Sequence, residues 1–231
     1  MKTMGLLGGM SWESTIPYYQ TVNRVVRDRL GGLHSAKVLL YSVDFHEVEA
    51  CQRSGRWADA GEILVAGARS LERGGAEFLV LCTNTMHKLA DQIEDAIGIP
   101  LLHIADATAA RVKAARLKRV GLLGTRFTME EDFYRGRLES RYELEVVVPP
   151  EEARKTVHRI IYDELCQGSV LEESRAAYRG IVADLRAQHV EGVILGCTEI
   201  GLLLRSEDVE VPLFDTAVIH AEEAARYALG L

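Results

Sequence analysis

Short apolar runs alternate along this chain with longer helix-like segments. The apolar runs predict strands at Thr3–Gly8, Lys37–Val43, Phe78–Cys82, Leu101–Ile104, Arg119–Gly124, Leu144–Val148, Gly192–Gly196 and Val211–Phe214. The longer segments predict helices, among them Ser14–Arg29, Ala58–Arg73, Ala105–Ala115, Glu130–Arg141, Arg154–Cys166, Glu172–Gln188 and Thr216–Leu229. Because strands that alternate with helices form parallel sheets covered by helices, the pattern predicts an α/β fold.

Three strand-and-turn segments recur in the same order, which indicates an internal duplication. The three pairs are Gly5–Gly8 with Gly121–Gly124, Leu79–Thr85 with Val193–Glu199, and Pro100–Leu101 with Pro212–Leu213. The offset stays nearly constant, from 116 residues for the first pair (5 to 121) to 112 for the last (100 to 212). One such match could be chance, but three ordered matches predict a duplicated α/β domain.

The duplication predicts two pseudo-symmetric three-layer αβα domains, each with a parallel four-stranded sheet. We expect residues 1–115 to form the first half and residues 116–215 the second. The C-terminal helix, residues 216–231, is expected to pack back on the first half, by symmetry with the helix at Ala105–Ala115. Ligands of open parallel sheets bind at the carboxyl ends of the strands, so we expect the active site in the interdomain cleft.

Composition narrows the class of protein. The chain has 231 residues, of which 48% are hydrophobic and 26% charged, as in ordinary globular proteins. A net charge of −7 argues against a nucleic-acid partner, which would select a basic face. No apolar run is long enough to cross a bilayer, and the N-terminus is a poor export signal, so we expect a cytoplasmic protein without a membrane partner.

The four cysteines, Cys51, Cys82, Cys166 and Cys197, have no CxxC metal or redox spacing. We therefore expect free thiols, no metal and no cofactor. Cys197 differs from the others because it ends a strand and leads a polar turn before a helix, where a helix dipole and N–H groups can stabilise a thiolate. The internal repeat pairs it with Thr83.

Four segments that follow strands collect glycine, hydroxyl and amide residues: Gly8–Ser11, Thr83–Thr85, Gly124–Thr128 and Cys197–Glu199. Their side chains and the N–H groups of the following helices can hold a carboxylate. For any one segment alone, helix capping is the commoner explanation.

Two of these segments carry a family resemblance. Thr83–His87 resembles the Cys-Asn-Thr-Ala-His signature of the aspartate/glutamate racemases, and Leu195–Ile200 resembles their Leu-Gly-Cys-Thr-Glu signature. Gly8–Thr15 and Gly124–Thr125 fit the glycine-rich turns that open each half in that family. The resemblance extends from about Met4 to His220, nearly the whole chain.

The resemblance implies a cofactor-independent isomerase, an amino-acid racemase without pyridoxal phosphate (PLP), with aspartate or glutamate favoured as substrate. In that family two cysteines flank the substrate α-carbon, where one removes the proton and the other returns it. This sequence has Thr83 in the first position, so Cys197 and Thr83 are the expected catalytic pair. Cys82 is expected in the core, because neighbouring strand residues point to opposite faces.

A threonine hydroxyl is a much weaker acid than a thiol, whose pKa is about 8.5. Thr83 is therefore a poor resting base, although it could donate or relay a proton, and we expect one enantiomer to react faster. By position, Asn84, Thr85 and Thr198 are expected to hold the α-carboxylate.

The further substrate-binding candidates are Met10, Gln52, Thr125 and Glu199. Arg53 could bind a second carboxylate or be a surface charge, and Glu164 would repel an acidic substrate if it faced the cleft.

Two alternative functions stay open at this point. One is a single-cysteine decarboxylase of the arylmalonate type, and the other is a non-catalytic amino-acid-binding protein. Solvent deuterium at the α-carbon of an otherwise intact amino acid would distinguish racemisation from both. A small-molecule amino acid is the expected partner in each case, and we expect the chain to form a homodimer.

Overall fold

The computed structural model describes residues 1–231, which divide into two compact units. Unit 1 comprises Met1–His103 and His220–Leu231, and unit 2 comprises Ile104–Ile219. Each unit contains one parallel four-stranded sheet, so the expected α/β class is confirmed. None of the helices combines the length and the apolar character that a membrane span requires.

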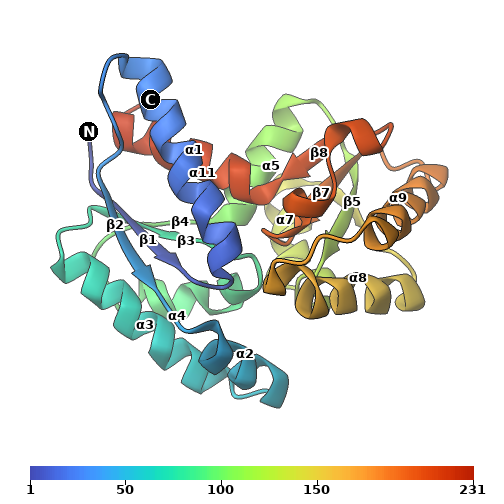
Figure 1. Cartoon of the computed structure of the whole chain (residues 1–231), viewed down its shortest axis with the longest axis horizontal. Coiled ribbons are helices and arrows are strands. Elements are labelled where there is room, and N and C mark those ends of the chain that lie inside the picture. Colours follow the sequence, from blue (N-terminus) through green and yellow to red (C-terminus); the bar gives the residue numbers. More distant parts are fainter. The chain divides into compact units, whose positions relative to one another are not determined.

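Unit 1 is built on the strand order β2-β1-β3-β4. The strands are β1 (Met4–Gly8), β2 (Val38–Ser42), β3 (Phe78–Leu81) and β4 (Leu101–Leu102). Helices α1 (Trp12–Leu30) and α11 (Thr216–Leu229) lie on one face of the sheet, and α3 (Trp57–Arg73) and α4 (Ala90–Glu94) lie on the other (Figure 1). The shorter α2 (Phe45–Ser54) follows β2 and packs against α3.

The strands of unit 1 carry apolar side chains on both faces, which explains why helices cover both sides of the sheet. Leu7 and Leu81 join Leu64 of α3 in one hydrophobic cluster. Their chain neighbours point to the opposite face, where the ring of Phe78 meets Tyr227 of α11 edge-on at 4.8 Å.

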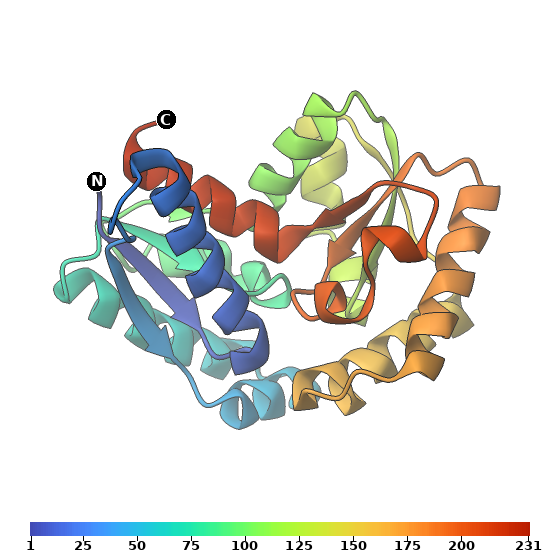
Figure 2. The same ribbon diagram turned by 45° about the horizontal axis from the view of Figure 1, so that its top comes forward.

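Unit 2 repeats this design with the strand order β6-β5-β7-β8. The strands are β5 (Arg119–Gly124), β6 (Glu145–Val147), β7 (Gly192–Gly196) and β8 (Leu213–Asp215). Figures 1 and 2 show α5 (Ile104–Ala114) and α7 (Arg135–Tyr142) on one face, with α8 (Glu151–Asp163) and α9 (Glu172–Ala187) on the other. The shared strand order supports the internal duplication.

One helix lies outside the half in which the sequence placed it. The first half was expected to end at residue 115, yet α5 packs in unit 2, where Ile104 and Val112 are part of the core. Asp106 of α5 also accepts two hydrogen bonds of 2.6 Å from Arg137 of α7. The C-terminal helix α11 begins in unit 2 and continues into unit 1, where the N–H of Lys2 donates to the Ala228 carbonyl at 2.9 Å.

The helix expected at Glu130–Arg141 begins later, as α7 (Arg135–Tyr142), and a separate short helix, α6 (Arg126–Glu130), precedes it. Helix α6 begins after Thr125, which caps it by accepting the Thr128 N–H at 3.3 Å. It ends where Glu131 adopts an extended conformation, with φ −97° and ψ 155°. The helix expected at Arg154–Cys166 begins earlier as α8, directly after Pro150, and a separate 3-10 turn, η2 (Leu165–Gln167), follows it.

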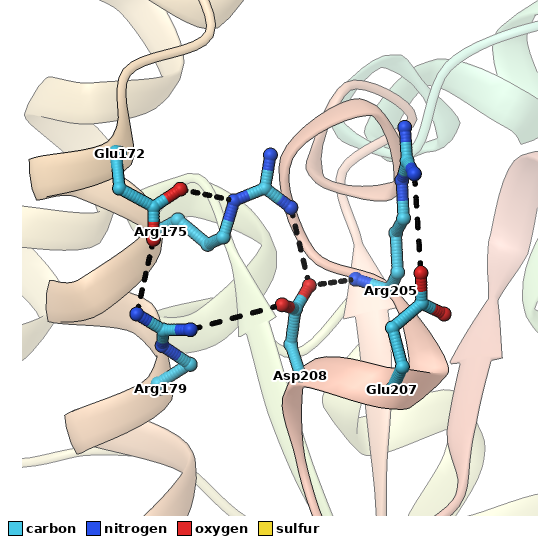
Figure 3. A network of polar contacts seen from close by, with 6 residues as sticks. All are labelled: Glu172, Arg175, Arg179, Arg205, Glu207 and Asp208. Atoms are coloured by element: carbon cyan, nitrogen blue, oxygen red, sulfur yellow. Dashed lines mark hydrogen bonds and ion pairs between the residues drawn. The ribbon is translucent and has the colours of Figure 1, made fainter.

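A network of ion pairs fixes the segment that follows the short helix α10 (Ile200–Leu203) in unit 2 (Figure 3). Asp208, in the 3-10 turn η3 (Ser206–Asp208), accepts from the N–H of Arg205 at 2.8 Å and from Arg175 of α9 at 3.2 Å. Glu172 pairs with Arg175 and with Arg179, each at 3.0 Å. The chain that leaves the β7 end is thereby tied to the helix that packs on the sheet.

Candidate active site

In unit 1 two polar segments leave neighbouring strands at the same sheet edge. Leu7 and Leu81 are paired in register, so the turn after β1 and the segment Thr83–Thr85 after β3 begin side by side. Gly9 has φ +91°, and a Cβ there would lie 2.5 Å from the Val43 carbonyl oxygen, so only glycine fits this turn. Met10, Thr83, Asn84 and Thr85 are all buried.

Two of the expected substrate-binding residues in unit 1 are engaged with protein groups. The side-chain amide of Gln52, on α2, donates to the Met86 sulfur at 2.8 Å. Met10 belongs to the hydrophobic cluster that includes Val48 and Cys51. Arg53 is an exposed surface charge that pairs with Glu49 at 3.4 Å.

Cys82 lies in the core, as strand alternation predicts. Its side chain has no exposed surface, and its thiol is 3.6 Å from the Val80 carbonyl oxygen. Burial raises the pKa of the Cys82 thiol far above its usual range. The thiolate form is therefore excluded here, and Thr83 is the residue at the strand end.

A cluster of buried histidines, which sequence reasoning missed, lies behind Thr83 in unit 1. The Nδ1 of His87 is 2.7 Å from the Thr83 carbonyl oxygen. The His87 ring centroid is 4.4 Å from that of His103 and 6.0 Å from that of His220. No spacing along the chain links His87 with His220, because α11 brings His220 here from the other end of the sequence. No His, Cys, Asp and Glu side chains of the structure gather in a group that could hold a metal ion.

In unit 2 two polar segments again leave neighbouring strands side by side. Gly124 of β5 and Gly196 of β7 are paired in register, and a Cβ on Gly124 would lie 2.7 Å from the Gly196 carbonyl oxygen. Thr125 and Cys197 follow these glycines, so they begin their turns side by side. Both side chains are buried.

Glu199 holds the Cys197 thiol. The Cys197 Sγ and the Thr198 Oγ1 each donate to Glu199 Oε2 at 2.9 Å, and Glu199 is only 1% exposed. Glu199 was expected to bind substrate, but in the structure its carboxylate binds the thiol of Cys197, two residues earlier.

The environment of Cys197 favours the thiol rather than the thiolate that the sequence suggested. Burial, followed by the charge of the Glu199 carboxylate, raises the pKa of the Cys197 thiol well above its usual range. The following helix α10 has only four residues, so it offers little dipole to oppose this effect. Cys197 is therefore a protonated thiol in direct contact with a carboxylate acceptor.

Two further polar side chains of unit 2 are engaged with protein groups. Tyr178 of α9 is fully buried and donates to the Val157 carbonyl at 3.3 Å; burial raises its pKa, so it stays a phenol. Glu164 accepts hydrogen bonds from Ser174 and from Arg159, the latter at 3.1 Å.

Comparison with known proteins agrees with this geometry. The family described as Asp/Glu/Hydantoin racemase matches residues 7–224. The broad-specificity amino-acid racemase RacX of Bacillus subtilis is 23% identical over 224 residues, which cover 95% of each chain.

Two solved structures are similar over nearly the whole chain. A protein of Yersinia pestis assigned to the Asp/Glu racemases is 58% identical, with a TM-score of 0.91, over 99% of this chain and 100% of its own. An aspartate racemase homologue from Pyrococcus horikoshii is 35% identical, with a TM-score of 0.84 and the same coverage. The chain belongs to the Asp/Glu/Hydantoin racemase family, and it is an isomerase of the amino-acid racemase type.

Proposed function

We propose that this enzyme racemises an acidic amino acid without PLP, with Cys197 as the base and Thr83 as the acid at the same α-carbon. The observation that carries the proposal is the 2.9 Å hydrogen bond from the Cys197 thiol to the buried carboxylate of Glu199. A thiol in contact with a proton acceptor can become the base for an α-proton.

The first step removes the α-proton. Glu199 takes the thiol proton, and the Cys197 thiolate then takes the α-proton as the C–H electron pair moves into the substrate. The product is an enediolate, whose negative charge needs hydrogen-bond donors around the α-carboxylate. Asn84, Thr85 and Thr198 supply amide and hydroxyl donors for this purpose.

The second step returns a proton to the opposite face. The internal repeat supports Thr83 in this role, because the strand residues Leu81 and Leu195 have equivalent pairing partners, Leu7 and Leu123. Thr83 follows Leu81 by two residues, as Cys197 follows Leu195. A hydroxyl donates readily to a strongly basic carbanion, but it is a poor base in the reverse direction.

An acidic substrate is supported by the relatives rather than by a charge in either unit. The Yersinia and Pyrococcus proteins are described by names that contain aspartate or Asp/Glu. The Bacillus relative is described as having broad specificity, so a wider substrate range is the natural variant of this proposal.

The decisive experiment incubates the enzyme in D₂O with a panel of L- and D-amino acids, followed by chiral chromatography and mass spectrometry. We expect inversion with one deuterium at the α-carbon and no loss of carbon, in protein treated with EDTA and free of PLP absorbance. Release of CO₂ would favour the decarboxylase instead. Binding without any exchange across the panel would show a non-catalytic protein.

A further inference from the structure

We propose that His87 is a positioning residue, which holds the main-chain carbonyl of Thr83 through its Nδ1–H and thereby fixes the Thr83 hydroxyl as a proton donor. The inference rests on the proposed function, since it assigns a support to one of its two catalytic groups. His87 itself touches neither the substrate nor the reacting atoms in this proposal.

The direction of the His87 hydrogen bond follows from its partner. A carbonyl oxygen can only accept, so at 2.7 Å the Nδ1 of His87 carries the hydrogen. The structure thus places a hydrogen on Nδ1 of His87, which a spectroscopic measurement can test.

Thr83 depends on this bond because it lies beyond the sheet. The β1–β3 ladder ends with the Cys82 N–H, which donates to the Leu7 carbonyl at 2.9 Å. After that point the chain turns, and the His87 ring closes the turn from four residues downstream, while its N–H donates to the Asn84 carbonyl at 3.1 Å. The ring therefore sets the orientation of the peptide that carries Thr83.

His87 is in turn held by groups whose own hydrogen bonds are fixed. His220 lies between the Leu102 carbonyl, 2.8 Å from its Nε2, and the Tyr18 hydroxyl, 2.9 Å from its Nδ1. Because the carbonyl must accept, His220 donates from Nε2 and accepts the Tyr18 hydroxyl at Nδ1. With the His103 ring tilted against it at 4.4 Å, the His87 ring packs between two other imidazoles.

Precise placement matters for the proton that Thr83 delivers. A catalytic group must lie within hydrogen-bond reach of the reacting atom, and a misplacement of about 1 Å can reduce the rate about 10²-fold. Cys197 has a separate support in Glu199. Loss of the His87 donor should therefore impair proton return by Thr83 and spare proton removal by Cys197.

The test compares three substitutions in D₂O, starting from the faster enantiomer. His87→Leu removes the donor, His87→Asn keeps an N–H near the Nδ1 position, and His87→Gln moves it toward the Nε2 position. For each variant, inversion is measured by chiral chromatography, and deuterium in the recovered starting enantiomer is measured by mass spectrometry. The second quantity reports removal and return of the proton by Cys197 alone.

We expect His87→Leu and His87→Gln to lower inversion about 10²-fold while exchange into the starting enantiomer changes by no more than a few-fold. His87→Asn should restore most of the inversion. A parallel loss of both rates, or no loss of either, would overturn the inference.

The tautomer provides a check that does not depend on turnover. Imidazole ¹⁵N shifts of the wild-type protein should show His87 protonated at Nδ1. A bare Nδ1 would contradict the inference even in a fully active enzyme. If the wild type neither exchanges nor inverts any amino acid, the proposed function fails, whatever the tautomer of His87.

Discussion

Units 1 and 2 share a strand order, yet the equivalent residues Thr83, after β3, and Cys197, after β7, have different polar neighbours. In unit 2 the Cys197 thiol lies against the carboxylate of Glu199, in an anionic setting. In unit 1 Thr83 follows β3, and its carbonyl is held by His87, whose ring packs near the buried His220. The duplicated scaffold therefore provides two different half-sites.

This difference suggests that the two residues have different roles, with Cys197 as the base and Thr83 as the acid. A carboxylate beside a thiol provides a destination for the thiol proton, which suits a base. A ring N–H that holds the Thr83 carbonyl fixes the position of the hydroxyl without a carboxylate beside it, which suits an acid that acts once the carbanion has formed. In a symmetric enzyme both half-sites would need the anionic arrangement, and unit 1 does not have it.

The largest expected effect comes from removing the base. Cys197→Ala should lower turnover by at least ~10²–10⁴-fold, the contribution usual for general acid–base catalysis. Cys197→Ser should be similarly impaired, because a serine hydroxyl yields its proton to Glu199 far less readily. Initial rates from both enantiomers, with circular dichroism to verify the fold, check the prediction. A folded Cys197→Ala enzyme with a near-normal rate would exclude the mechanism.

The next prediction concerns the acid and its direction. The enantiomer whose α-hydrogen points at Cys197 should react much faster than the other, which needs Thr83 as a base. Thr83→Cys installs a second thiol and should narrow the gap between the two initial rates, while the equilibrium between enantiomers cannot change. Thr83→Ala should abolish most inversion and leave α-proton exchange by Cys197.

Cys82→Ala is the matched control, because it tests whether Thr83 or its neighbour Cys82 is the functional residue. Because Cys82 is a fully buried core residue, its truncation should cost stability rather than rate. Equal wild-type rates for both enantiomers, or an inactive Cys82→Ala beside an unaffected Thr83→Ala, would mean that Cys82 is the functional residue.

The sequence predicts the strand ends well, because buried parallel strands appear as short, continuous apolar runs. β5 and β7 have the bounds that the apolar runs predicted, and the repeat distinguished Thr83 from Cys82. Such information is local, or it recurs at a fixed offset along the chain.

The supporting residues could not be predicted in the same way. The contact between His87 and His220 depends on α11 returning to unit 1, and no chain spacing encodes it. The sequence analysis predicts that Glu199 binds substrate, whereas its carboxylate accepts from the Cys197 thiol. A position two residues from Cys197 does not reveal where the carboxylate points. Helix α5 lies in unit 2 rather than in the first half, because it packs against the unit 2 core and pairs Asp106 with Arg137, contacts that its own sequence does not encode.

A third prediction separates the two effects of Glu199 on Cys197. The Glu199 carboxylate contributes to the raised pKa of the thiol, so Glu199→Gln should lower that pKa. Alkylation of Cys197 by iodoacetamide should then extend to lower pH. Racemisation should nevertheless fall, by about 10²-fold, because glutamine cannot accept the thiol proton. A variant that racemises faster as its thiol becomes more acidic would contradict the proposed role.

The last prediction concerns stability rather than rate, and it distinguishes the units by pH. Burial lowers the pKa of His220 to about 4, against an ordinary value of 6.5. The unfolded chain therefore binds a proton between these values that folded unit 1 does not bind. Stability is fully present above pH 6.5 and is lost as the pH falls toward 4, by up to about 3 kcal/mol at ~1.36 kcal/mol per pKa unit.

Asp106 in unit 2 gives the contrasting case. Burial opposes ionisation there, but the hydrogen bonds and charge of Arg137 outweigh it and lower the pKa of Asp106. Its contribution is present above the unfolded value, about 3.9, and is lost only below it.

Denaturant unfolding from about pH 3 to pH 7 tests this contrast. His220→Gln keeps a donor for the Leu102 carbonyl but does not titrate, so its stability should fall less than that of the wild type across this range. Asp106→Asn should run parallel to the wild type down to about pH 4 and diverge only below it. If His220→Gln and the wild type lose stability in parallel, His220 is not a buried neutral imidazole, and the hydrogen-bond directions assigned to His220 would have to be abandoned.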